Sequence, residues 1–300
     1  RSLVGSEMCI RDRFEECSDL APLHNPANLK GVKAVSELMP GLPQVGVFDT
    51  AFHQTMPKKA YMYAIPYELY DKYAIRRYGF HGTSHRYVSK RVCDFLGVKP
   101  EDKKVITCHI GNGASISAVK NGQCYETSMG LTPLEGVMMG TRSGDIDASA
   151  VLAIMKAEGL TPDEMSDLLN KKSGVLGISG VSSDMREVEA ASSAGNRRAA
   201  LALEMYSHRI KKYIGAYAAI MGGVDVIVFT AGVGEHQWDV RYNSVSGLEF
   251  LGVKIDEEKN RKNFGEEEII SAADSRVKVV VVPTDEELLI ASDTLALVQQ

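Results

Sequence analysis

One apolar run limits the folds available to this chain more than any other feature. Asp225 to Thr230 (DVIVFT) is almost continuously apolar, and the glycine-rich segment Ala231–Gly234 follows it at once. A strand that is apolar on both sides is typical of a parallel sheet covered by helices, because both of its faces are buried. The run therefore predicts a strand buried on both faces in an α/β fold.

Further runs predict the other elements of this fold. Strands are predicted at Val45–Phe48, Val105–His109, Ala114–Val119 and Val277–Val282. Asn121-Gly122, after the third of these, is a strong hairpin signal. Helices are predicted from a capping box at Thr161 to a stop at Gly174, from Arg197 to Met221, and from Glu286 to Val298. Ligands of such a fold usually bind at the carboxyl ends of its strands.

Composition excludes several classes of protein. The net charge of −5 and the lack of a long Lys/Arg run argue against nucleic-acid binding. No run approaches the roughly 18 apolar residues of a membrane span. The five cysteines are odd in number and lack CxxC spacing, which argues against a disulfide framework or a zinc site and favours reduced thiols in a cytoplasmic enzyme. Residues 1–13 (RSLVGSEMCIRDR) have neither periodicity nor a signal-peptide core, so we interpret them as a non-native segment.

Three glycine-rich loops indicate a site for nucleotide phosphates. They are His109–Gly113 (HIGNG), Gly140–Asp145 (GTRSGD) and Ala231–Glu235 (AGVGE), and two of them follow predicted buried strands. Glycine lets successive backbone N–H groups approach an anion closely, although one such loop alone is usually only a turn. The Walker A motif, the complete dinucleotide fingerprint and the protein-kinase motifs are missing. A nucleotide would therefore be bound by a different motif.

Polar residues with several possible roles lie close to these loops in the sequence. Asp49 follows a predicted strand and could cap a turn. His81 and His85 flank Gly82 and could be half of a metal site or surface residues. The acidic run Asp285–Glu287 could simply favour the first turn of the last helix. Each residue alone has a simple structural explanation.

Together these residues suit phosphoryl transfer. That reaction needs positive charge and hydrogen bonds at the equatorial oxygens of the transferred group, which Arg142 and His81 could supply. It also needs a magnesium ion held by carboxylates and phosphate oxygens, for which Asp49 and Glu286 are the candidates.

A series of motifs resembles the acetate kinase family, in the order in which that family carries them. They are FDTAFH, YGFHGTSH, HIGNG, GTRSGD, SSDMR, AGVGE and PTDEE, and the likeness extends from about Phe14 to the end of the chain. The resemblance implies the ribonuclease-H-like, actin-like ATPase fold, with duplicated α/β domains and a cleft between them. It also implies reversible, Mg²⁺-dependent (or Mn²⁺-dependent) transfer of phosphate between ATP and acetate, giving acetyl phosphate and ADP, by a cytoplasmic homodimer.

The resemblance also assigns roles to residues. Asp49 would be the essential carboxylate near the transferring phosphate, His81 and Arg142 would stabilise the transition state, and Glu286 would bind magnesium. The nucleotide phosphates would be bound by His109, Ile110, Gly111, Asn112 and Gly113. The adenosine pocket would be lined by Asp184, Met185, Arg186, Gly232, Val233, Gly234, Glu235 and His236. The family usually has Asn at position 236 and often Phe at position 185.

The front of the chain departs from the family pattern. The strand with an Asn, the Ser-rich phosphate loop and the substrate-pocket Arg that open the family are not found, and the first recognisable segment is Ala21–Asn28. We therefore expect residues 14–48 plus 284–300 to be the remnant of an incomplete first domain. Residues 49–283 would form the second, nucleotide-binding domain. We also expect little turnover from this chain alone.

Two alternatives to acetate kinase activity stay open. A propionate or other short-chain carboxylate kinase would differ in the volume of its acid pocket. A non-catalytic nucleotide-binding module of the same fold is disfavoured by the presence of Asp49, His81 and Arg142. The preferred acid, the physiological direction and the strength of the dimer are not set by the sequence.

Overall fold

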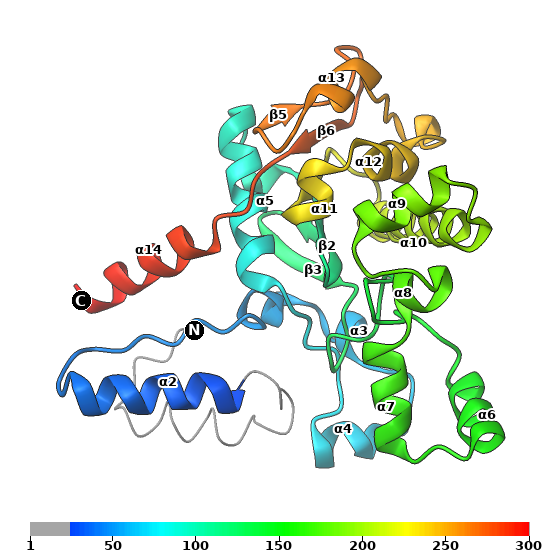
Figure 1. Cartoon of the computed structure of the whole chain (residues 1–300). Helices are drawn as coiled ribbons and strands as arrows, with labels where there is room; N and C mark the ends of the chain where they lie inside the picture. Colours follow the sequence, from blue (N-terminus) through cyan, green and yellow to red (C-terminus); the bar gives the residue numbers. More distant parts are fainter. Residues whose placement is uncertain (1–24, 300) are drawn as a thin grey trace.

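A six-stranded sheet with helices on both faces forms the body of the computed structural model, which describes residues 25–299 (Figure 1). The strand order is β3-β2-β1-β4-β6-β5. The strands are β1 (Lys104–Ile110), β2 (Ala114–Lys120), β3 (Gln123–Thr127), β4 (Val226–Thr230), β5 (Glu268–Ile269) and β6 (Lys278–Val281). β1, β4 and β6 are parallel, whereas β2, β3 and β5 run antiparallel to their neighbours.

The central strand confirms the prediction from the apolar run. All five residues of β4 are buried. Val226 and Val228 belong to the apolar cluster on one face of the sheet, and Ile227 and Phe229 belong to the cluster on the other face. Successive side chains of a strand point to opposite faces, so a strand covered on both sides has to be apolar throughout.

Two long helices provide most of this cover. α5 (Gly82–Leu96) packs Val88 and Val92 against the face that carries Val226 and Val228. α10 (Arg197–Met221) covers the other face with buried residues that include Tyr206, Ile210, Ile214 and Tyr217. The bounds of α10 are those predicted from its periodicity, and its tyrosines pack in the core or against it, as expected.

Shorter helices surround this framework. They are α3 (Lys58–Tyr61), α4 (Tyr67–Tyr73), α6 (Ala148–Glu158), α7 (Pro162–Lys171), α8 (Gly174–Ser179), α9 (Met185–Ser193), α11 (Ala231–His236), α12 (Trp238–Val245) and α13 (Glu257–Lys262), with 3₁₀ turns at Ala51–Thr55, Pro100–Asp102 and Glu249–Leu251. α7 begins with the predicted capping box between Thr161 and Glu164. The predicted hairpin is confirmed, since Asn121 and Gly122 have φ values of 56° and 74° between β2 and β3.

Two predictions about elements were wrong. Val45–Phe48 is not a strand, because no strand of the described sheet lies beside it to accept and donate its backbone hydrogen bonds. Gly174 does not end the helix that starts at Pro162, since α7 ends at Lys171 and Gly174 begins α8. Gly174 has φ of 62°, and a side chain there would clash with the backbone of Met139 and Arg142. Glycine at position 174 therefore allows two segments of the chain to approach each other closely.

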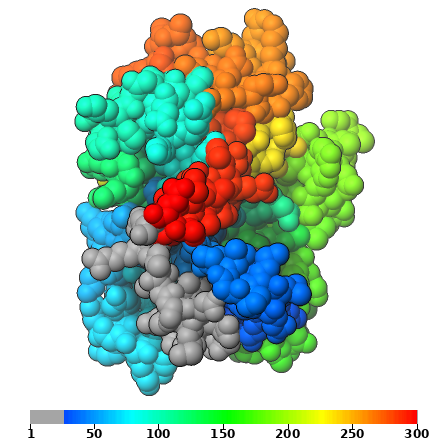
Figure 2. Space-filling model, turned by 90° about the vertical axis from the view of Figure 1, so that its left-hand side faces the viewer, coloured from blue at the N-terminus to red at the C-terminus, as the bar shows by residue number. Residues whose placement is uncertain are grey.

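The helices α2 (Asn25–Leu38) and α14 (Glu286–Val298) lie away from the sheet (Figure 1). Figure 2 shows them beside each other on one face, with α14 in red and α2 in dark blue. α14 has its predicted bounds, yet Leu288, Leu295 and Val298 are exposed on it. The division into a first-domain remnant (14–48 plus 284–300) and a second domain (49–283) stays a prediction, and residues 1–13 lie outside the described residues.

Three cysteines lie in the part of the chain that the structure describes. Cys93, Cys108 and Cys124 are free and buried, while Cys9 and Cys17 lie outside the described residues. None of the helices between residues 25 and 299 is long and apolar enough to cross a membrane.

Shortening a side chain of β4, the central strand, should test whether helices bury both of its faces. Ile227→Ala should lower the free energy of unfolding by about 2–5 kcal/mol, because it leaves a cavity between β4 and the helix layer. Ile220→Ala, at an exposed position of α10, should lower it by less than about 1 kcal/mol. Urea unfolding followed by circular dichroism measures both, and equal losses would contradict this packing.

Candidate active site

The start of α5 is held by Asp49. Its carboxylate accepts hydrogen bonds from the backbone N–H groups of His81 (2.5 Å) and Thr83 (3.3 Å), and its carbonyl accepts one from Gly82 (2.9 Å). A Cβ at position 82 would clash with that carbonyl, so the close approach requires glycine. His81, with φ of 56°, turns the chain into the helix. A carboxylate at a helix N-terminus is favoured by the exposed N–H groups and the helix dipole.

Four histidines lie close together near the start of α5, on the face of the sheet that this helix covers. The rings of His81 and His109 stack with 4.1 Å between centroids and 21° between planes, and His53 and His85 make edge contacts with this group. Burial is the main cause that lowers the pKa of His81 to about 4, His53 to about 4 and His109 to about 3. The positive charge of Arg142 lowers the pKa of His81 further. These rings are therefore neutral at pH 7.

Hydroxyl groups link the histidines to the sheet. Ser115 Oγ lies 2.8 Å from His81 Nδ1 and 2.7 Å from His85 Nε2, and His85 Nδ1 lies 2.7 Å from Thr107 Oγ1. On the other side of the stack, His109 Nδ1 lies 2.8 Å from Ser84 Oγ. Sequence reasoning missed these hydroxyls, although Ser115 and Thr107 alternate with apolar residues on predicted strands.

Arg142 is brought to the same place by its loop. A Cβ on Gly113 would lie 3.5 Å from Arg142 Nη1 and also 3.5 Å from His81 Nε2. The loop Gly140–Asp145 therefore meets the loop His109–Gly113 and the start of α5 around one glycine. Arg142 Nη1 donates to the carbonyl of Pro133 (3.2 Å), and burial lowers the pKa of the guanidinium from its ordinary value.

The side chain of Asp145 holds the loop that carries Arg142 in place. Its Oδ1 accepts from the N–H of Gly136 (2.9 Å), and its Oδ2 accepts from the hydroxyl of Tyr213 on α10 (2.8 Å). The backbone N–H groups of Ser173, Val175 and Leu176 at the start of α8 donate to carbonyls of residues 139–141. The backbone of the loop that carries Arg142 is thus held by contacts with α8 and α10.

A second arginine holds the segment that leads into this loop. Arg77 donates from Nη1 to the carbonyls of Thr127, Ser128 and Met129 at the end of β3, each at 2.9–3.0 Å. Its Nη2 pairs with Glu135 at 2.5 Å, and the hydroxyl of Tyr63 donates to the same carboxylate, also at 2.5 Å. This network gave no signal in the sequence, because its members are far apart in the chain.

The residues predicted to line the adenosine pocket differ in how far they are buried. Asp184 caps α9 and forms an exposed ion pair with Arg186 at 2.6 Å, and the hydrogen bonds from Arg186 lower the pKa of Asp184 to about 2. Met185 is only 5% exposed and belongs to the core. Ser183 Cβ lies 3.3 Å from the place of a Cβ on Gly140, so the start of α9 borders the phosphate loops.

The glycine-rich segment after β4 is a helix, α11, rather than a loop. Gly232 has open space where its Cβ would lie, whereas Gly234 is buried against β1 and β4. Glu235 accepts from the N–H groups of Ala231 (2.7 Å) and Thr284 (3.2 Å), which ties β4 to the segment after β6. His236 Nδ1 lies 3.0 Å from the carbonyl of Phe264.

A fully buried arginine secures the end of α11. Arg241 donates to the carbonyls of Gly234 and Glu235, to both oxygens of Asn260 and to the carbonyl of Asn263. Its acceptors are all neutral, and burial lowers its pKa to about 10. The hydrogen bonds compensate the desolvation of the charge, so the arginine fixes the geometry of the loops it joins.

Glu286, the predicted magnesium ligand, is close enough to Asp49 for the two charges to interact. Burial raises the pKa of Glu286, and the negative charge of Asp49 raises it further. No group of three or more His, Cys, Asp or Glu side chains suited to a metal ion exists among residues 25–299. Magnesium commonly uses only one or two carboxylates and completes its shell with water and substrate phosphates. Two carboxylates that repel each other, Asp49 and Glu286, fit such an ion.

Comparison with known proteins decides the family. A profile of the acetokinase family matches residues 3–292. The chain belongs to the acetokinase family. It is 71% identical over 291 residues to the acetate kinase of Phocaeicola vulgatus and 64% identical over 300 residues to that of Thermotoga maritima. The first alignment covers 97% of this chain and 73% of the relative, and the second covers 99% and 74%.

Solved structures confirm the predicted fold class. The acetate kinase of Porphyromonas gingivalis superposes with a TM-score of 0.95 at 57% identity, over 98% of this chain and 73% of that one. A propionate kinase from Francisella tularensis gives 0.90 at 45% identity, over 97% and 73%. This acetokinase chain thus places its own Asp49, His81 and Arg142 in a fold shared with carboxylate kinases.

A carboxyl group on α9 should make stability depend on pH. Burial, together with the charge and hydrogen bond of Asp239, raises the pKa of Glu189 to about 7. The ionised side chain therefore destabilises the folded protein above that pH. Glu189→Gln should raise the free energy of unfolding by about 1 kcal/mol at pH 8, less than the whole shift implies because the group is partly exposed. The gain should disappear below the ordinary pKa of glutamate.

Urea unfolding at pH 8 and pH 4 measures this difference. Glu187→Gln, an exposed position on the same helix, is the matched control and should change little at either pH. A gain for Glu189→Gln that is equal at both pH values would contradict the explanation.

Proposed function

We propose that this chain is the catalytic part of an acetate kinase, which transfers the γ-phosphoryl group of ATP reversibly to acetate and yields acetyl phosphate and ADP. One observation carries the proposal: Arg142, His81 and the His109–Gly113 loop meet around Gly113, with Asp49 at the start of the same helix. That arrangement gathers a cation, neutral hydrogen-bonding rings and backbone N–H groups at one point. Phosphoryl transfer depends on such positioning and charge.

The proposed reaction needs no proton-transfer step. A carboxylate oxygen of acetate attacks the γ-phosphorus in line, the new O–P bond forms, and the bond from phosphorus to the β,γ-bridging oxygen breaks as ADP leaves. Because acetate is ionised at neutral pH, no base has to activate it. Arg142 would bind the equatorial oxygens as negative charge spreads over them, and His109–Gly113 would hold the phosphate chain.

The proposal includes Mg²⁺ as the bound cation. Glu286 would hold the ion, and its repulsion from Asp49 in the absence of a cation supports that role. A magnesium ion neutralises charge on the β- and γ-phosphates. Asp49 would lie near the transferring phosphate, where its capping of α5 keeps the carboxylate fixed.

The adenosine would bind between α9 and α11. Arg186 is exposed and Asp184 is half-buried at the start of α9, and the open space at Gly232 leaves room for a ligand on α11. Met185 and Glu235 would act indirectly, the first from the core and the second through backbone hydrogen bonds. His236 would face the ligand only if its contact with Phe264 is released.

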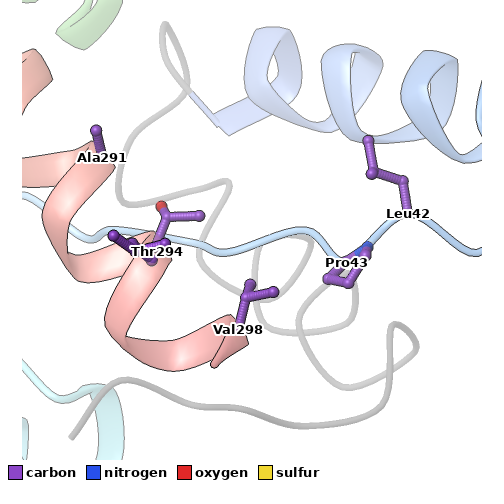
Figure 3. Close-up of a pocket in the computed structure, with 6 residues that line it drawn as sticks. Leu42, Pro43, Ala291, Thr294 and Val298 are labelled. Atoms are coloured by element: carbon purple, nitrogen blue, oxygen red, sulfur yellow. The ribbon is translucent and has the colours of Figure 1, made fainter. Parts of the chain in front are cut away.

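We assign residues 14–48 plus 284–300 to a first domain, and the described part of it holds residues 25–48 and α14. A groove of about 450 Å³ between them is lined by Leu42, Pro43, Ala291, Thr294, Leu295 and Val298 (Figure 3). Apolar residues on both sides suit packing against a further layer of a domain. We also propose that the protein is a cytoplasmic homodimer, as the family resemblance implies.

Propionate kinase activity is the second candidate, because the propionate kinase from Francisella tularensis has the same fold over 97% of this chain. Acyl phosphate trapped as hydroxamate should be measured with acetate, propionate and butyrate. Two proteins should be compared: this chain, and this chain joined to the part of the Phocaeicola vulgatus relative that lies outside the matched region. Acetate should give the highest kcat/KM. Nucleotide binding without acyl phosphate in either protein would overturn the proposal in favour of a non-catalytic module.

Removal of the guanidinium should abolish most of the activity. Arg142→Ala should lower kcat about 10³-fold in whichever of these two proteins forms acyl phosphate. A cation aimed at the transferred group contributes this much in related reactions. Arg198→Ala is the control, because that arginine is exposed and donates to the carbonyls of Gly177 and Ile178. Equal effects of the two substitutions on kcat, with both variants folded, would contradict the role of Arg142.

A further inference from the structure

A fully buried histidine, His53, has no role in the proposed reaction, although it belongs to the same sequence motif as Asp49. It lies in the 3₁₀ turn Ala51–Thr55, and none of its surface is exposed. This turn is attached to β3, because the hydroxyl of Thr55 donates to the carbonyl of Cys124 at 2.8 Å. The segment from Asp49 to Thr55 therefore has a defined place beside the sheet.

The contact with Phe80 fixes the proton of the His53 ring. His53 Nε2 lies 2.9 Å from the backbone carbonyl oxygen of Phe80. A carbonyl oxygen can only accept a hydrogen bond, so Nε2 carries a proton and donates it. Burial lowers the pKa of His53 to about 4, so the ring is neutral at pH 7 and Nδ1 is bare. Nδ1 lies 3.1 Å from Sγ of Cys124, which can donate its own proton there.

The packing around the His53 ring keeps this nitrogen directed at the carbonyl. Gly79 has φ of 77°, and a Cβ there would lie 2.7 Å from Cδ2 of His53 and 2.4 Å from Thr127. Glycine therefore lets the segment that leads to α5 pass close to the ring. Phe52 and His85 make edge contacts with the ring, at 5.7 Å and 5.8 Å between centroids.

The peptide group between Phe80 and His81 is held at both of its polar atoms. Its carbonyl oxygen accepts from His53 Nε2, and its N–H donates to the carboxylate of Asp49 at 2.5 Å. Asp49 and His53 belong to one short segment, so the same part of the chain holds both sides of this peptide group. Because a peptide group is planar, the two hydrogen bonds together fix its orientation.

His81 has an unfavourable backbone conformation that this arrangement can enforce. Its φ is 56°, in the left-handed region that residues with a side chain rarely adopt. This angle is the rotation between the peptide group before His81 and the chain that continues into α5. A strained conformation of this kind persists only where the surrounding structure enforces it. The same angle decides the direction in which the imidazole leaves the backbone.

We propose that His53 is a positioning residue, which holds the carbonyl of Phe80 and thereby keeps His81 in the left-handed conformation that brings its ring to Gly113 and Arg142. His81 Nε2 and Arg142 Nη1 each lie 3.5 Å from the place of a Cβ on Gly113. His53 itself stays buried and does not contact the transferred group. The effect on catalysis rests on the proposed function, but the effect on the backbone of His81 does not.

Two substitutions of similar volume separate the hydrogen bond from the packing. His53→Gln keeps an N–H donor of similar reach, whereas His53→Met fills the same space without a donor. A third variant, Ile214→Ala, controls for a loss of stability alone. Ile214 is fully buried under α10, on the other face of the sheet.

Crystal structures of these variants of this chain test the effect on the backbone without reference to activity. His81 should keep its left-handed φ in His53→Gln and leave that region in His53→Met. In addition, ¹⁵N NMR of the wild-type chain with labelled histidine should show a proton on Nε2 of His53 and none on Nδ1, with the signals assigned from His53→Gln. A bare Nε2 in the wild-type chain, or an unchanged φ of His81 in His53→Met, would overturn the proposal.

Kinetics should be measured in whichever of the two proteins compared above forms acyl phosphate. His53→Met should lower kcat about 10²-fold, as a small misplacement of a catalytic group does, and change the KM for ATP less than about twofold. His53→Gln should recover most of the lost kcat. Ile214→Ala should change kcat less than about threefold, because its effect is confined to stability.

A double-mutant cycle with His81→Ala tests whether His53 acts through His81. In that background His53→Met should lower kcat no further, because the side chain that His53 positions is already gone. A further loss as large as the one in the wild-type background would refute the positioning role. An absence of acyl phosphate in every variant and in the wild type, with the backbone of His81 changed as expected in His53→Met, would count against the proposed function alone.

Discussion

The capping of α5 by Asp49 is the interaction on which the rest of the site depends. The same carboxylate accepts hydrogen bonds from two N–H groups at the start of the helix, and its negative charge raises the pKa of Glu286, so it both fixes the helix and adds charge to the site. α5 in turn places His81 and His85 over the sheet. A carboxylate that lost these hydrogen bonds would leave both the helix start and the histidines without a fixed position.

The face of the sheet that α5 covers is apolar at one end and polar at the other. Val105 near the start of β1 is part of an apolar cluster, whereas Thr107 and His109 further along the same face make hydrogen bonds. The apolar end anchors the helix, and the polar end, which lies at the carboxyl end of the strand, carries the candidate site. Buried polar groups in such a place are stable only when each has a partner, and here hydroxyls supply the partners.

Much of the fold and the composition of the site could be predicted from the sequence, because periodicity, caps and contiguous motifs are local signals. β4, α10 and α14 were found in this way. Contacts between distant residues could not be predicted: Arg77 with Glu135, Asp145 with Tyr213, and Arg241 with the end of α11. Val45–Phe48 has the composition of a strand, but a strand exists only with a partner.

In the proposed function, Arg142, His81 and the His109–Gly113 loop surround the transferring phosphoryl group. The most direct measurement is a crystal structure of the active protein with ADP, Mg²⁺, acetate and aluminium fluoride, a mimic of that group. The aluminium fluoride should lie between the guanidinium of Arg142 and the loop, with acetate on its far side from ADP. A fluoride bound away from Arg142 and His81, with ADP in place, would overturn the proposed site.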